Sequence, residues 1–300
     1  MKLGMDIGGS HVSMAVIDNN FKIKEYYTQT IHQNNIDKIL KYFKNTIGKI
    51  VEKYEIKEIN IAVPGIIKNN IIEKSVNLNM QNANIIELIE KILNKINKSK
   101  IKVKIKNDAQ CAAIAEHKLG CLQGYANCVF LTLGTGIGSG IIIDNKLIEN
   151  TEIGHTIIDP NGKVCNCGKK GCFEKYASML SFKEECKKRL NLKESTKSCD
   201  IREYLENNIN NKEVQEVINE YIKYLAIGIS NIINTFEPEA IGIGGSFVYF
   251  EHLLLKKLVE YIKVNRLIFN EKYILNIQTA KYLNEAGNIG SCINDERVDV

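Results

Sequence analysis

Two stretches decide the fold: residues 3–17 read LGMDIGGSHVSMAVI, and residues 129–144 read VFLTLGTGIGSGIIID. In each stretch two apolar runs flank a glycine turn, which predicts a β-hairpin with the glycines at its tip. The two stretches match at a constant offset of 126, with Gly8 on Gly134 and Asp18 on Asp144. A hairpin that opens each half of a chain is typical of a duplicated α/β domain, so we expect two related domains that face each other.

The segments around these hairpins alternate between helical and strand patterns, as an α/β protein requires. Apolar residues recur at close to the helical period in residues 36–54 and 214–235. The other expected elements are helices at 85–96, 109–119, 181–190 and 286–294, strands at 59–63 and 101–105, and a strand with a glycine turn at 240–246. Polar residues up to about 211 predict no regular element. We expect one domain over residues 1–118 and another over 119–285, with residues 286–300 packing back on the first.

The composition indicates a folded protein without a nucleic-acid or membrane signature. Hydrophobic residues make up 44% of the 300 residues, which is enough for two cores. The 40 Lys and Arg residues exceed the 35 Asp and Glu residues only slightly and form no basic block. No apolar run approaches the ~18 residues that cross a bilayer, and Asp6 comes too early for a signal peptide. We therefore expect a cytoplasmic protein.

Three glycine turns follow predicted strands and are candidates for binding phosphate. Glycine lets backbone N–H groups approach an anion because no Cβ stands in the way. The turns lack both the Gly-Lys-Ser/Thr ending of a P-loop and the Gly-x-Gly-x-x-Gly spacing of dinucleotide sites. One such turn alone is more often an ordinary hairpin, but three together favour a phosphate site. They lie at residues 8–10, 134–136 and 244–246.

Two aspartates stand where a strand ends. Asp6 ends the first strand and could hold Mg²⁺, directly or through water, or could simply form the turn. Asp108 stands between a strand and a helix, where it could cap the helix N-terminus or act as a general base at the edge of a cleft.

The sharpest local signal is a cluster of three cysteines and a histidine. His155, Cys165, Cys167 and Cys172 form a Cys₃His set suited to tetrahedral Zn²⁺, against the alternative of incidental reduced thiols. Four protein ligands leave no open position, so the metal would be structural and would fix the backbone that carries Glu152 and Glu174. We expect the metal to affect sugar binding only through the geometry of these two residues, and to affect ATP binding at the distant glycine turns less.

Taken together, these motifs resemble the ROK family of bacterial sugar kinases and sugar-responsive repressors, within the actin-like ATPase superfamily. The resemblance covers nearly the whole chain, in family order. The matching segments are residues 6–10, 63–65, 75–78, 107–108, 133–136, 152–155, 165–174 and 244–246. It implies two actin-like (ribonuclease-H-like) domains with a cleft for ATP and sugar between them.

The resemblance also implies a role for each matching residue. The residues implied for ATP and Mg²⁺ are Asp6, Gly8, Gly9, Ser10, Gly134, Thr135, Gly136, Gly244 and Gly245. Those implied for the sugar are Gly65, Asn77, Asn107, Asp108, Glu152, His155 and Glu174, with Asp108 as the general base. Zinc is implied at His155, Cys165, Cys167 and Cys172. Three departures from the family pattern are His11 in place of a common Lys, Val76 in place of Pro, and a shorter connection over residues 147–152.

The implied activity is ATP-dependent phosphorylation of a hexose hydroxyl, glucose-like and at O6, with N-acetylmannosamine, allose or fructose as alternative substrates. A non-catalytic sugar-binding protein is a further alternative. A ROK repressor would carry a helix-turn-helix before the first hairpin, and Asp6 leaves no room for one, so we expect no nucleic-acid partner. A zinc-dependent nucleic-acid module is disfavoured because only four lysines surround the cysteines, Lys163, Lys169, Lys170 and Lys175. Relatives in the family suggest a homodimer or homotetramer and no membrane partner.

Overall fold

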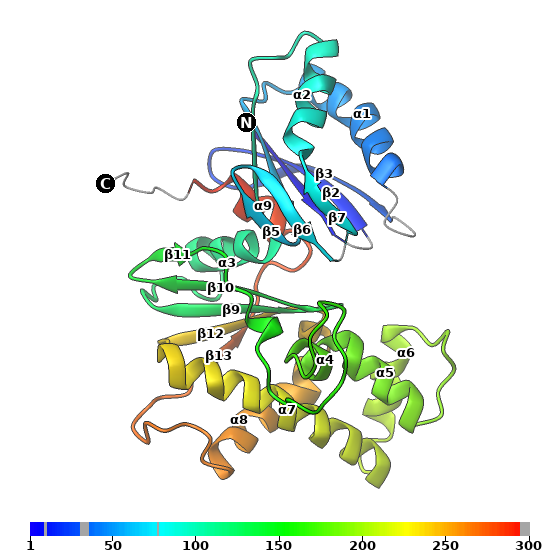
Figure 1. The fold of residues 1–300 in the computed structure, drawn as a ribbon, viewed down its shortest axis with the longest axis vertical. Coiled ribbons are helices and arrows are strands. Elements are labelled where there is room, and N and C mark those ends of the chain that lie inside the picture. Colours follow the sequence, from blue (N-terminus) through cyan, green and yellow to red (C-terminus); the bar gives the residue numbers. More distant parts are fainter. Residues whose placement is uncertain (9–10, 31–35, 77, 295–300) are drawn as a thin grey trace. The chain divides into compact units, whose positions relative to one another are not determined.

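The computed structural model describes residues 1–294, apart from residues 9–10, 31–35 and 77. Contacts divide the chain into two compact units (Figure 1). The first comprises residues 1–123, 146–150 and 282–300, and the second comprises residues 124–145 and 151–281. Both units combine β-sheets with helices, as the sequence predicts for an α/β protein.

The first unit is built on a five-stranded sheet in the order β3-β2-β1-β4-β8. Strand β1 pairs antiparallel with β2 and parallel with β4, and β4 pairs parallel with β8. The strands are β1 Lys2–Ile7, β2 His11–Ile17, β3 Ile23–Thr30, β4 Glu58–Val63 and β8 Lys102–Asn107. A small separate sheet contains β5 Ile66–Lys68, β6 Ile71–Ser75 and β7 Met80–Ala83.

Helices pack on both faces of this five-stranded sheet because successive strand side chains point to opposite sides. Val12, Met14 and Val16 of β2 belong to one apolar cluster, which also contains residues of α1 (Ile36–Lys53) and α2 (Ile85–Lys95). Ala15 and Ile17 belong to the other cluster, with α3 (Asp108–Leu119) and α9 (Ala286–Cys292). Helix α9, red in Figure 1, therefore packs on the first unit from the far end of the sequence.

The second sheet has the order β11-β10-β9-β12-β13, with β9 antiparallel to β10 and parallel to β12. Its strands are β9 Cys128–Leu133, β10 Ile137–Ile143, β11 Lys146–Ile148, β12 Ala240–Gly245 and β13 Ile277–Thr279. The helices of this part are α4 Glu174–Ala177, α5 Met179–Arg189, α6 Ser198–Asn207, α7 Lys212–Phe236 and α8 Glu251–Val264, with short 3₁₀ helices η1 Ile153–His155 and η2 Ser246–Phe250.

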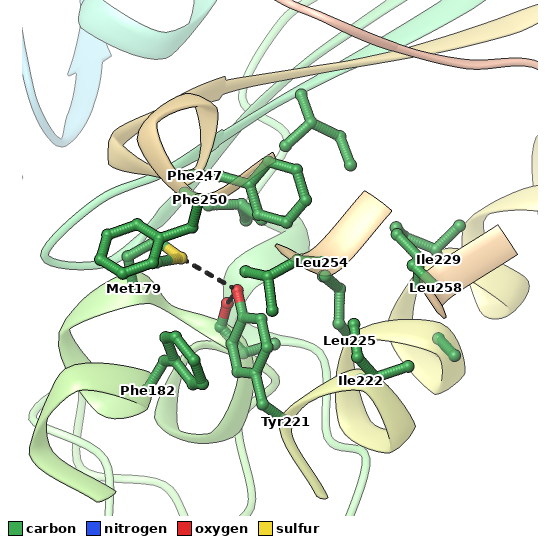
Figure 2. Close-up of a cluster of buried hydrophobic side chains, with 14 of the residues drawn as sticks. Met179, Phe182, Tyr221, Ile222, Leu225, Ile229, Phe247, Phe250, Leu254 and Leu258 are labelled. Atoms are coloured by element: carbon green, nitrogen blue, oxygen red, sulfur yellow. Dashed lines mark hydrogen bonds between the residues drawn. The ribbon is translucent and has the colours of Figure 1, made fainter. Parts of the chain in front are cut away.

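A large apolar core lies between these helices and the sheet. Figure 2 shows its centre, where Tyr221 of α7 lies among Met179, Phe182 and Leu254. The hydroxyl of Tyr221 is buried, and it donates to the carbonyl of Ala177 at 3.1 Å and contacts the sulfur of Met179 at 3.3 Å. A buried hydroxyl needs such partners, so the Tyr221 hydroxyl is accommodated in the core without an unpaired donor.

The two hairpins share their strand pairing but differ in loop length. Ile7 pairs with Val12 in the first, whereas Leu133 pairs with Ile137 in the second. The second loop is thus one residue shorter, and the constant offset of 126 holds for the outgoing strand but is displaced by one residue in the returning strand. A one-residue shift exchanges the faces of a strand, so pairing rather than sequence offset defines the repeat.

The helices expected from apolar periodicity are present, with ends shifted by one to a few residues. The polar stretch before residue 211 contains α6, so the expectation that it has no regular element was wrong. Only Ile201 and Leu205 of α6 are buried, and a stripe of two residues gives a weak helical signal. Among the described residues, no helix is both long enough and apolar enough to cross a membrane.

Candidate functional site

Asp6 lies at the carboxyl end of β1, beside α9. A Cβ built on Gly287 would lie 2.4 Å from the Asp6 carboxylate, so only glycine allows α9 to approach this closely. Asp6 keeps some solvent exposure, but the surrounding protein removes most of the water from its carboxylate. This burial raises the pKa of Asp6 to about 8, with a further contribution from the negative charge of Asp108. The two carboxylates are therefore close enough to repel each other.

The junction between β8 and α3 is held by Asn107. Its Oδ1 accepts a hydrogen bond from the backbone N–H of Gln110 at 3.0 Å, and its Nδ2 donates to the carbonyl of Gly65 at 3.0 Å. Asn107 is therefore the N-cap of α3, a role that the sequence alone suggested for Asp108. Asp108 is the first helical residue, and its Oδ1 accepts from the N–H of Ala109 at 2.8 Å.

Gly65 follows β4 in a conformation that favours glycine. Its φ is +117°, and a Cβ there would lie 2.4 Å from the carbonyl oxygen of Lys74. The turn and the Asn107 side chain thus hold each other, because the Gly65 carbonyl accepts the Asn107 amide. In the first hairpin, Gly8 donates its N–H to the carbonyl of His11 at 2.9 Å. The predicted site residues Gly9, Ser10 and Asn77 lie outside the described residues.

The second unit brings two of its glycine turns together. Gly134 donates its N–H to the carbonyl of Gly136 at 3.0 Å, and the exposed Thr135 lies at the tip between them. Gly245 ends β12, which is parallel to β9, with φ +71° and ψ −158°. A Cβ on Gly245 would lie 2.5 Å from the carbonyl oxygen of Leu133, directly before the first turn. The tight fit explains why this position requires glycine.

The four predicted zinc ligands lie together. Their ligand atoms are all within 4.8 Å of one another in His155, Cys165, Cys167 and Cys172. The sulfurs of Cys167 and Cys172 are 3.6 Å apart, and the Cys165 sulfur lies 3.8 Å from Nδ1 of His155. Tetrahedral Zn²⁺ with Zn–S bonds of about 2.3 Å requires ligand separations of about 3.8 Å. The geometry and the donor set therefore fit zinc.

Glu152 and Glu174 flank this cluster and face the same region. Burial raises the pKa of Glu152, the nearby His155 lowers it, and the charge of Glu174 raises it again. These three predicted sugar ligands are therefore neighbours within the second unit. Among the described residues, those assigned to the sugar fall into two groups, with Gly65, Asn107 and Asp108 in the first unit.

Glu174 also contacts the glycine hairpin, which contradicts the expectation that the cysteine region and that hairpin are distant. Its Oε2 accepts a hydrogen bond from the backbone N–H of Ile137 at 2.9 Å. A Cβ on Gly136 would lie 2.2 Å from the same oxygen. The two motifs are 37 residues apart in the chain and share one carboxylate, because packing of η1 and α4 brings them to the start of β10.

Gly287 borders the candidate site beside Asp6, and no sequence motif singled it out. It lies in the short helix α9, and its only role visible here is to leave room for the Asp6 carboxylate. The available signal was the presence of two glycines, Gly287 and Gly290, within a seven-residue helix, where glycine is otherwise unfavourable.

Two α/β units, each with a glycine-tipped hairpin and the same strand pairing, define a protein of the actin-like ATPase fold. The chain belongs to the ROK family, whose family model matches residues 2–294. A xylose repressor from Caldicellulosiruptor bescii is 30% identical, over 97% of this chain and 76% of the repressor. An N-acetylmannosamine kinase from Haemophilus influenzae is 29% identical, over 96% of this chain and 93% of the kinase.

Among solved structures, a ROK family glucokinase from Streptomyces griseus in complex with glucose and AMPPNP superposes with a TM-score of 0.83 at 22% identity, covering 97% of each chain. The resemblance stated from the motifs is confirmed, and so is the two-domain actin-like fold class. The protein is thus a ROK family sugar kinase or a related regulator.

Proposed function

We propose that this protein is an ATP-dependent sugar kinase in which Asp108 is the general base. The observation that carries the proposal is the pair of carboxylates, Asp6 and Asp108, at the carboxyl ends of β1 and β8. Asp108 is fixed at the start of α3 by the Asn107 cap and lies near enough to Asp6 to raise its pKa. Phosphoryl transfer needs a placed base and a place for the metal that neutralises phosphate charge, and this pair offers both.

The proposed sugar ligands come from both units. In the first they are Gly65, Asn107 and Asp108, together with Asn77 by its sequence position, and in the second they are Glu152, His155 and Glu174. Carboxylate, amide and imidazole groups of this kind form hydrogen bonds with sugar hydroxyls. Asp108 accepts the proton of the attacking hydroxyl as that oxygen bonds to the γ-phosphorus of ATP, and ADP leaves.

The proposed ATP site uses the glycine turns. The turns at residues 8–10 and 134–136 bind the phosphates, and Gly244 and Gly245 contact the nucleoside. Gly8 and Gly134 use their own N–H groups inside their turns, so in the second turn the donors are those of Thr135 and Gly136. Asp6 associates with Mg²⁺, which would neutralise phosphate charge when bound. Support comes from the position of Gly134, where the hairpin tip is open, with nothing within 4 Å of a Cβ on that residue.

We infer that the substrate is a hexose, phosphorylated at O6 in a glucose-like molecule, with N-acetylmannosamine, allose and fructose as alternatives. Two of these sugars have support from similar proteins, since one is a kinase of N-acetylmannosamine and another is a glucokinase solved with glucose. Because the proposed reaction uses ATP, we infer a cytoplasmic protein. The Cys₃His cluster holds a structural zinc ion, and the assembly we expect is a homodimer or homotetramer.

A sugar-responsive regulator is the second candidate, because a xylose repressor shares 30% identity over most of this chain. One experiment separates the two functions. ADP release is measured with ATP, Mg²⁺ and a panel of hexoses and xylose, while calorimetry measures sugar binding without ATP. A kinase releases ADP with at least one sugar that it binds. Sugar binding without any ADP release would favour the regulator, and DNA binding could then be tested directly.

A further inference from the structure

Helix α3 carries a carboxylate that is completely buried, that of Glu116. Its Oε2 accepts a hydrogen bond from the backbone N–H of Cys121 at 2.8 Å, and its Oε1 accepts one from the backbone N–H of Tyr282 at 2.6 Å. A buried carboxylate is unfavourable unless donors surround it, and hydrogen bonds to a charged acceptor are strong. Glu116 therefore ties α3 to a segment 166 residues further along the chain.

The backbone of Glu116 holds the same region. Its carbonyl accepts hydrogen bonds from the N–H groups of Gly120 and Leu122, each at 3.0 Å. A Cβ on Gly120 would lie 1.9 Å from Oε2 of Glu116, so glycine is needed there to leave room for the carboxylate. Each residue from 120 to 122 thus donates its backbone N–H to this one residue.

These contacts lie where the chain passes from one unit to the other. The passages follow residues 123, 145, 150 and 281. Cys121 lies just before the first of them, and Tyr282 lies directly after the last. Leu119, Leu147 and Tyr282 pack against one apolar cluster that includes α3. Within the first unit, segments that border the passages therefore pack on the apolar cluster to which α3 contributes, and two of them are also hydrogen-bonded to Glu116.

We propose that Glu116 is the positioning residue of an interdomain hinge. By holding the backbone on both sides, at Cys121 and at Tyr282, it keeps the passages in one arrangement, so that the units move along a single path when substrate binds. A hinge consists of a few residues at the ends of helices or strands, whose backbone angles change when domains move. If the backbone next to the hinge is held in place, the domains on either side can move as rigid bodies. The catalytic part of its test rests on the proposed kinase function.

Glu116→Gln tests the carboxylate with almost no change in volume. The amide retains one oxygen for one of the two backbone donors, but its NH₂ group faces the other donor and cannot accept from it. One of the two backbone hydrogen bonds, to Cys121 or to Tyr282, is therefore lost. Gly120→Ala tests the same pair of hydrogen bonds with Glu116 intact, because the added methyl group must displace the carboxylate. Ile47→Val, in the α1 core on the opposite sheet face, is the matched control for a general loss of stability.

The first readout needs no activity. Hydrogen exchange in the unliganded variants is expected to accelerate about tenfold or more at the amides of Cys121 and Tyr282, and small-angle scattering is expected to show a wider range of radii of gyration. Both effects should occur in Glu116→Gln and in Gly120→Ala but not in Ile47→Val. Unchanged scattering, or exchange that rises uniformly along α3, would overturn the hinge role.

The second readout is kinetic. If the hinge allows more arrangements of the two units, the arrangement that binds sugar is populated less. The apparent affinity for sugar then falls in proportion to that population. We expect the KM for sugar in Glu116→Gln to rise about tenfold, with a smaller change in kcat, measured well below the unfolding temperature. A sugar KM within twofold of wild type also overturns the proposal. If the wild-type protein phosphorylates no sugar, the proposed function fails, while exchange and scattering still decide the role of Glu116.

Discussion

The Glu174 carboxylate accepts the backbone N–H of Ile137 at 2.9 Å, so the residue that follows the cysteine cluster also fixes the start of β10 at the tip of the second hairpin. The contact is tight, because a methyl group on the adjacent Gly136 would overlap the same oxygen. A residue assigned to the sugar thus holds the backbone that we assign to phosphate. The two halves of the proposed reaction are mechanically linked within one unit.

Glu174→Ala is therefore expected to raise the KM for ATP as well as the KM for sugar, each by about tenfold, since the Ile137 N–H loses a charged acceptor. Glu152→Ala, for which no bond to the hairpin is found among the described residues, is the matched control and should affect sugar alone. Steady-state kinetics with each substrate varied in turn measures both constants. An unchanged ATP KM in Glu174→Ala would show that the hairpin keeps its shape without this bond.

Asp108→Asn tests the base directly. The amide preserves shape and hydrogen bonding but cannot accept the proton, so kcat should fall by about 10² or more while sugar affinity stays within about tenfold of wild type. Because Asn107 is the helix cap, this change should leave the stability of α3 largely intact. Rate measurements and calorimetric sugar titration give the two values, and a rate loss below tenfold would reject Asp108 as the base.

The glycines at two turns should respond differently to the same substitution. A Cβ on Gly134 meets nothing within 4 Å, so Gly134→Ala should leave thermal stability unchanged and raise the KM for ATP. Gly245 has φ +71° and ψ −158°, a region open almost only to glycine, so Gly245→Ala should destabilise the fold by roughly 1–3 kcal/mol. Thermal unfolding and ATP kinetics of both variants check this difference. Equal stability losses would contradict the open geometry at Gly134.

Zinc removal should weaken the binding of both substrates. We expect one zinc ion per chain in protein purified without added metal, and Cys167→Ser should lower the unfolding temperature and raise the KM for sugar and for ATP through Glu174. Cys199→Ser is the matched control, because Cys199 is exposed on α6 outside the cluster. Elemental analysis and calorimetry supply the measurements. Fully active, fully stable protein without zinc would exclude a structural metal here.

The sequence determined the features that depend on neighbours in the chain. Apolar periodicity predicted α1 and α7, and the alternation of glycines with apolar runs predicted both hairpins. The cysteines and His155 carry their own signal, because three thiols within eight residues are uncommon unless they bind something. These patterns are local, so no knowledge of packing was needed to recognise them.

Tertiary structure alone decided the relationships between residues far apart in the chain. Asn107 rather than Asp108 caps α3 because the same amide reaches Gly65, and one residue less in the second hairpin sets its register. Glu116 in an alanine-rich helix looks like an ordinary surface glutamate, but it is buried because Tyr282 returns to meet it. A carboxylate gains or loses its partners according to which backbone donors packing brings within 3 Å, and residue order does not encode that distance.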